Sequence, residues 1–124
     1  MAAPNVVNVS TITAKTAYLT PSDTSANVLL ANAASSGKVF KINTIIACNV
    51  DGTANYAATI AINTAAAGSG TSFPIVSTVS IPNDATLVAS DKNSAIYLEE
   101  DKSIVVTSST ASKITYIVSY EEIS

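Results

Sequence analysis

Residues 38–50 read KVFKINTIIACNV, and this stretch decides the fold class. Apolar and polar side chains alternate along it, which is the pattern of a half-buried β-strand. Asp51 and Gly52 follow as a turn dipeptide, and residues 55–64 return with a second alternating pattern. The two segments together predict a long β-hairpin over residues 38–64.

Period-two alternation continues along most of the chain, with turn residues between segments that begin about 8–15 residues apart. This spacing is typical of a β-sandwich or jelly roll. We therefore predict an all-β fold, a single antiparallel sandwich of about eight strands over residues 11–124, with an extended N-terminal arm at residues 1–10. The predicted core consists of Phe40, Ile42, Ile46, Cys48, Ile60, Ile62, Val79, Ile104, Val106, Ile114, Tyr116 and Val118.

The charge content is low and argues against nucleic acid as a partner. Charged residues make up 12% of the 124 residues, and the formal net charge is −3. The six basic residues are all lysines and are scattered, so no basic stripe is present to bind nucleic acid.

No apolar run is long enough to span a membrane, and the N-terminus lacks the pattern of a signal peptide. We expect a protein that stays in the cytoplasm where it is made or leaves by a route other than secretion, such as lysis.

The residue types needed for most catalytic mechanisms are missing. The chain has no His, which excludes Ser-His and Cys-His pairs, and its single cysteine, Cys48, excludes an internal disulfide. Acidic residues cluster at 99–101 and at 121–122, but neighbouring residues on a strand point to opposite faces. We interpret these acids as a solvated surface, with an incidental cation site or glycoside hydrolysis as the alternatives. We therefore predict no catalytic, cofactor-binding or metal-binding residues.

Two features indicate a function in surface contacts. The five tyrosines are expected mainly in the core or at its rim, as for Tyr116 and Tyr120, whereas Tyr18 and Tyr56 are candidates for receptor contact. Near the N-terminus, valines alternate imperfectly with asparagines, which suits a strand added to the sheet edge of a neighbouring subunit. The alternative for this segment is a disordered terminus. The predicted interface residues are Val6, Val7, Val9, Ile12 and Tyr18.

Several segments carry a resemblance to a known family. They are IPNDATLVAS at residues 81–90, IYLEEDKSIVV at 96–106, IVSYEEI at 117–123, and VFKINTII at 39–46 followed by NVDG at 49–52. Their order resembles small virion structural proteins of tailed bacteriophages, especially phages of aquatic bacteria. The resemblance covers about residues 38–123 and describes strands and turns without carrying any chemistry. In one turn, glycine is usual where this chain has Glu100.

The resemblance implies a virion component that is present in many copies. Because the chain is short and lacks a stalk, we favour a non-enzymatic capsid decoration (cement) protein that binds the major capsid protein or other virion proteins. Its expected location is the virion, as a homo-oligomer with a trimer as one option, without nucleic acid or membrane partners and without a cofactor. The alternative is a receptor- or carbohydrate-binding sandwich module of the tail, neck or fibres.

Overall fold

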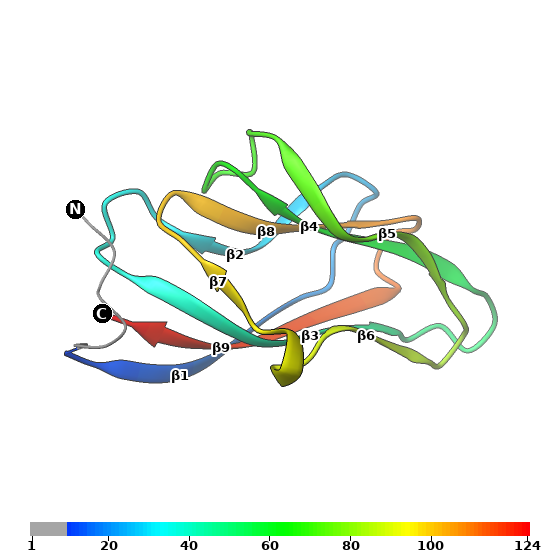
Figure 1. Ribbon diagram of the computed structural model, residues 1–124. Coiled ribbons are helices and arrows are strands. Elements are labelled where there is room, and N and C mark those ends of the chain that lie inside the picture. Colours follow the sequence, from blue (N-terminus) through cyan, green and yellow to red (C-terminus); the bar gives the residue numbers. More distant parts are fainter. Residues whose placement is uncertain (1–9) are drawn as a thin grey trace.

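The protein is a two-layer β-sandwich, as the sequence predicts. The computed structural model describes residues 10–124, in which nine strands form two antiparallel sheets packed face to face (Figure 1). No α-helix occurs in this part of the chain, and its only helical element is the short 3₁₀ turn η1 (Lys92–Ser94). The arm predicted at residues 1–10, with Val6, Val7 and Val9, lies outside the described residues except for Ser10.

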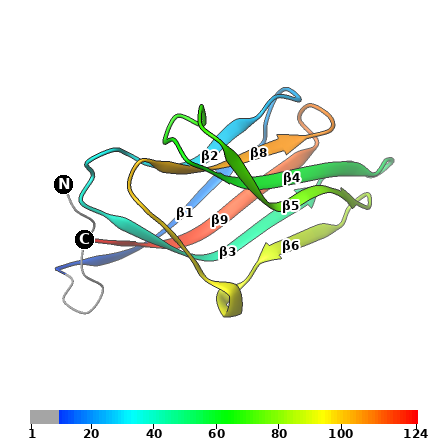
Figure 2. The same ribbon diagram turned by 45° about the horizontal axis from the view of Figure 1, so that its top comes forward.

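Each sheet has a simple strand order, which Figure 2 shows most clearly. The first sheet runs β1-β9-β3-β6, with β7 also paired to β3, and the second runs β2-β8-β4-β5. The strands of the first sheet are β1 (Ile12–Leu19), β9 (Ile114–Ile123), β3 (Val39–Asn49), β6 (Thr86–Ser90) and β7 (Ile96–Leu98). Those of the second are β2 (Asn27–Asn32), β8 (Lys102–Ser108), β4 (Tyr56–Asn63) and β5 (Ser72–Ile81).

The hairpin predicted over residues 38–64 is wrong, because its two strands belong to different sheets. β3 pairs with β9, β6 and β7, whereas β4 pairs with β5 and β8. The chain crosses between the layers after Asn49, where Asp51 accepts hydrogen bonds from the backbone N–H of Thr53 at 2.8 Å and from its hydroxyl at 2.6 Å. Alternation shows which side chains of a strand share a face, but it does not show which strand lies alongside.

A β-bulge at Asn43 reverses the inward and outward faces of β3. Ile42 pairs with Tyr120 and Thr44 pairs with Ser119, so Asn43 is an extra residue on the β3 side of the ladder. An extra residue shifts the alternation by one position, and every later side chain of the strand changes face. The bulge therefore decides which residues of this central strand enter the core.

Beyond the bulge, Ile45, Ala47 and Asn49 point inward and are completely buried. Ile46 and Cys48, which uninterrupted alternation would place in the core, point outward and are partly exposed. The core prediction is wrong for these two residues, and its error begins at the bulge.

The rest of the predicted core is largely confirmed. The buried members of the predicted set are Phe40, Ile42, Ile60, Ile104, Val106, Ile114, Tyr116 and Val118. Ile62 packs against this cluster but is only partly buried. Val79 is also partly exposed, and it lies beside Thr78, whose left-handed backbone (φ 51°) coincides with a register shift between β5 and β4.

Buried asparagines end three of the strands and fix the loops that follow. Asn32, Asn49 and Asn63 are the last residues of β2, β3 and β4, and each is at most 1% exposed. The Asn49 amide donates hydrogen bonds to the carbonyls of Ala54 at 2.9 Å and Ile81 at 3.0 Å. Because a buried amide without partners would destabilise the fold, these hydrogen bonds hold the loop backbones in place.

The bulge yields a testable prediction about two neighbouring isoleucines. Ile45→Ala should lower the free energy of unfolding by about 2–5 kcal/mol, because it leaves a cavity in the core. Ile46→Ala should cost about 1 kcal/mol or less, because its side chain is partly exposed on the outer surface. Urea unfolding of the two variants measures the difference. Equal costs would show that β3 has no face reversal at Asn43.

Candidate docking face

The outward surface of the first sheet carries a row of apolar side chains that crosses four strands. Tyr18 of β1 pairs with Ile117 of β9. Ile117 in turn pairs with Ile46 of β3, which pairs with Val88 of β6. Tyr18 and Val88, at the two ends, are 76% and 57% exposed. At a strand spacing of about 4.8 Å, these four residues, which we call the apolar row, span roughly 14 Å.

Uncharged side chains flank the apolar row on both sides. The first flanking row is Thr16, Ser119 and Thr44. The second is Thr20, Thr115, Cys48 and Thr86. The hydroxyls of Thr20 and Thr115 form a hydrogen bond at 2.8 Å. The apolar row and the two flanking rows together form what we call the docking face.

Charged side chains border the docking face one row further along the strands. Lys41 of β3 lies opposite Glu121 of β9 in the ladder. Glu121 also accepts a hydrogen bond from the Asn43 side-chain amide at 3.2 Å, from Nδ2 to Oε2. Next to Lys41 in this row, Tyr97 of β7 is 51% exposed. The docking face itself therefore carries no charged side chain, and Lys41 and Glu121 border it beyond the row that contains Ser119.

The outward surface of the second sheet differs because a loop lies on it. Residues 64–71 connect β4 to β5, and a Cβ placed on Gly68 would lie 3.1 Å from the Val28 side chain and 3.2 Å from that of Val105. The Asn63 side-chain oxygen holds the loop by accepting hydrogen bonds from two loop N–H groups, at 3.0 and 2.9 Å. Val28 and Val105 of this sheet are thus covered by the loop, whereas Tyr18 and Val88 of the docking face are exposed within residues 10–124.

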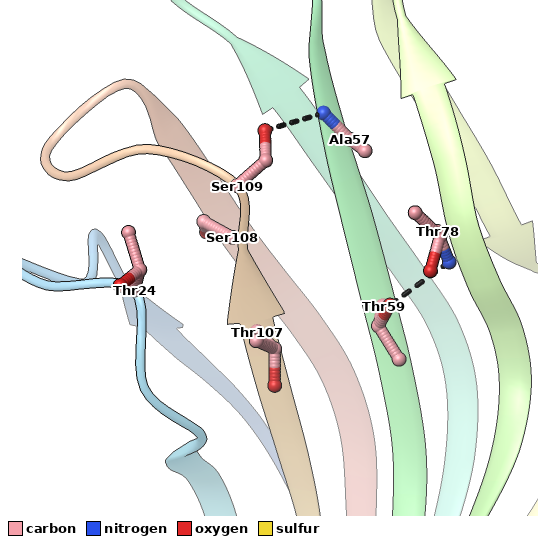
Figure 3. Close-up of a pocket in the computed structure, with 7 residues that line it drawn as sticks. All are labelled: Thr24, Ala57, Thr59, Thr78, Thr107, Ser108 and Ser109. Atoms are coloured by element: carbon pink, nitrogen blue, oxygen red, sulfur yellow. Dashed lines mark hydrogen bonds between the residues drawn. The ribbon is translucent and has the colours of Figure 1, made fainter.

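The second sheet also carries a pocket of about 270 Å³ (Figure 3). Its lining residues are Thr24, Ala57, Thr59, Thr78, Thr107, Ser108 and Ser109. Two of the hydroxyls already accept backbone hydrogen bonds of 2.9 Å, Thr59 from the N–H of Thr78 and Ser109 from the N–H of Ala57. The lining contains neither a charged nor an aromatic side chain, so the polar side-chain groups that the pocket offers are hydroxyls.

The structure places the two described members of the predicted interface on β1. Ile12 is 55% exposed and Tyr18 is 76% exposed, and both point outward from the first sheet. Sequence reasoning missed the central residues of the apolar row, Ile46 and Ile117. The sequence does carry a signal for these two residues, because each lies next to an apolar residue that faces the core. A strand that is apolar on both faces usually has both faces covered.

Strand β1, which presents these two residues, is tied to its neighbours by ion pairs. The Lys15 ammonium lies 2.6 Å from a carboxylate oxygen of Glu122, and Lys38 contacts the other oxygen of the same carboxylate. Hydrogen bonds from Lys15 and then Lys38 lower the pKa of the Glu122 carboxyl below its ordinary value. A largely buried carboxylate thereby links β1, β9 and the chain just before β3.

Two aspartates, Asp51 and Asp101 of the acidic cluster at 99–101, hold loop backbones. Asp51 accepts hydrogen bonds from Thr53 and, at 3.1 Å, from the Tyr56 hydroxyl, and the Thr53 bonds are the main reason that the pKa of the Asp51 carboxyl is lowered. Asp101 has a left-handed backbone (φ 58°) and accepts a hydrogen bond from the Ala66 N–H at 3.4 Å. The left-handed residue of this turn is thus Asp101 and not the preceding Glu100.

Within residues 10–124, no group of three or more His, Cys, Asp or Glu side chains is arranged to hold a metal ion. In the same part of the chain, no helix is long and apolar enough to cross a membrane. The sequence matches no protein-family model and no curated protein. The docking face is therefore the feature from which a function can be argued.

The Glu122 ion pairs predict a pH-dependent contribution to stability. Folding lowers the pKa of the Glu122 carboxyl, so its ion pairs stabilise the protein fully at pH values above the ordinary pKa of 4.5. This contribution is lost as the pH falls through the folded-state pKa. Glu122→Gln should therefore cost most near pH 7 and progressively less below about pH 4.5. Urea unfolding of both proteins across this range gives the difference. A cost that is equal at every pH would contradict the prediction.

Proposed function

We propose that the protein is a non-enzymatic virion structural protein that decorates a capsid, with its docking face against the coat. The resemblance of residues 38–123 to small phage virion proteins suggests the setting. The apolar row is the single observation that supports the mode of action. A row of apolar side chains exposed across four strands, with uncharged polar residues at its sides, has the character of a protein–protein contact surface.

The chemistry of the docking face defines the partner surface that would fit it. Tyr18 and Val88 would enter shallow apolar depressions, and the threonine hydroxyls beside them would hydrogen-bond to exposed backbone groups of the coat. Because the face carries no charge, attachment would depend little on ionic strength. The high exposure of Tyr18 suits an anchoring role, since tyrosine is enriched at binding hot spots.

The second candidate function is a receptor- or carbohydrate-binding module of the tail, neck or fibres. The hydroxyl-lined pocket of the second sheet favours it, because sugars are bound partly through hydrogen bonds. The pocket has no aromatic lining residue on which a sugar ring could stack. This candidate therefore ranks second.

Copy number separates the two functions. Quantitative gel analysis of purified virus particles should find the protein in hundreds of copies if it decorates the capsid, and associated with tail-less heads. A few copies per particle, recovered with tails, would contradict decoration and support the second candidate.

A single substitution tests the docking face. Val88→Lys places a charge at an exposed end of the apolar row and should weaken binding to undecorated particles at least about tenfold. The matched control is Ser80→Lys, an exposed position on β5 of the other sheet, which should bind like the unchanged protein. Thermal unfolding should show both variants folded. If Val88→Lys binds as tightly as the control, attachment does not use this face.

A further inference from the structure

Strand β1 is a regular sheet edge. Its ladder with β9 runs without interruption from the pair Ile12–Ile123 to the pair Leu19–Tyr116. β1 contains no proline and no bulge, and none of the strands within residues 10–124 pairs with its second side. A straight, unpaired edge of this length presents backbone donors and acceptors that another strand can use.

The other sheet edges carry features that impede pairing. In the second sheet, β2 has a register shift between Val28 and Leu30, and β5 contains Pro74, the left-handed Thr78 and two register shifts. In the first sheet, the edge opposite β1 is formed by β6 and β7, which have only five and three residues. Bulges, proline and short length are the usual means of blocking an edge. β1 is the exception among the described edges.

The alternation of the β1 ladder shows which backbone groups are free. Thr11 and Ser124 exchange backbone hydrogen bonds of 3.0 and 2.9 Å, so odd-numbered residues of β1 direct their N–H and C=O groups toward β9. The even-numbered residues direct theirs to the open edge. Those residues are Ile12, Ala14, Thr16 and Tyr18, whose side chains also point outward from the first sheet.

We propose that β1 pairs antiparallel with β1 of a second copy of this chain, with Thr16 on the two-fold axis. In an antiparallel pair, residues that lie opposite each other have their side chains on the same face of the sheet. In this register the unpaired backbone N–H and C=O groups of Thr16 form hydrogen bonds with those of Thr16 in the second copy. Tyr18 then lies opposite Ala14 of the second copy, where the small side chain leaves room for the ring. Lys15 lies opposite Ala17, so no like charges meet.

The neighbouring register is less favourable. Centred on Lys15, it would place the two lysines directly opposite each other, in a pair whose Cα atoms approach to about 4.5 Å. Each Lys15 is already held by Glu122, so neither ammonium can turn away without losing that ion pair. Registers centred further along the strand shorten the overlap. Charge and overlap together therefore select Thr16.

The proposed dimer goes beyond the proposed function and does not depend on it. Joining two copies through β1 makes one continuous sheet across the axis and brings two docking faces onto the same side. Because both copies use the one regular edge among the described strands, the pairing closes at two chains. It therefore implies a dimer, in contrast to the trimer considered from the sequence.

Proline at position 16 tests the pairing selectively. Thr16→Pro removes an N–H that points to the open edge, so the ladder with β9 is retained while pairing of copies is blocked. Sedimentation equilibrium should give about twice the chain mass of 12.6 kDa for the unchanged protein and for the control Thr16→Val. The dissociation constant of the Thr16→Pro dimer should be at least about tenfold higher than that of the unchanged protein. A monomer for the unchanged protein, or a dimer that persists in Thr16→Pro, would overturn the proposal.

Disulfide trapping tests the register without relying on the folding of a proline variant. In a Cys48→Ser background, Thr16→Cys should cross-link two copies on mild oxidation, because residues on the axis have Cα atoms about 5.5 Å apart. Ala14→Cys is the matched control, since its counterpart lies four residues further along the partner strand. Cross-linking of Ala14→Cys instead, or of neither variant, would overturn the register. Loss of particle binding by Val88→Lys would leave this result unaffected.

Discussion

The bulge at Asn43 is the constraint on which both the core and the outer surface depend. β3 is the central strand of its sheet and pairs with three others, so a change of face within it affects the whole layer. With the bulge, Ile45 and Ala47 face the core beside Val118 and Tyr116, their partners on β9. Without it, Asn49 would point to solvent and the three hydrogen bonds that fix the crossover loop would be lost.

The same bulge creates the candidate docking face. Once the alternation has shifted, Ile46 faces outward and aligns with Ile117 and Val88 on the neighbouring strands. The apolar row is thus a consequence of strand register, and no single residue produces it. A protein with so little charge has few means of discouraging contact on such a surface. Its low charge and its apolar row both agree with a function in assembly.

The fold class followed from the sequence because period-two alternation is a local property that most of the strands show. The predicted hairpin failed because pairing is a non-local property, and the turn after Asn49 is compatible with either a hairpin or a crossover. The bulge at Asn43 could not be predicted, because positions 45 and 46 are both isoleucine and either one could face the core. Of the candidate site, Tyr18 was among the predicted interface residues, whereas the apolar side chains of the neighbouring strands align with it only through the register.

The described edges of the two sheets differ in how easily another strand could pair with them. Pro74 and Thr78 distort β5, and the edge opposite β1 is divided between two short strands. If every edge were open, a sandwich with so few charges would join copies in several directions and form irregular aggregates. Because β1 is the one regular edge among the described strands, the proposed pairing uses that edge. In the proposed dimer Lys15 also limits the register, because centring the pairing on Lys15 would place the two lysines opposite each other, whereas centring it on Thr16 does not.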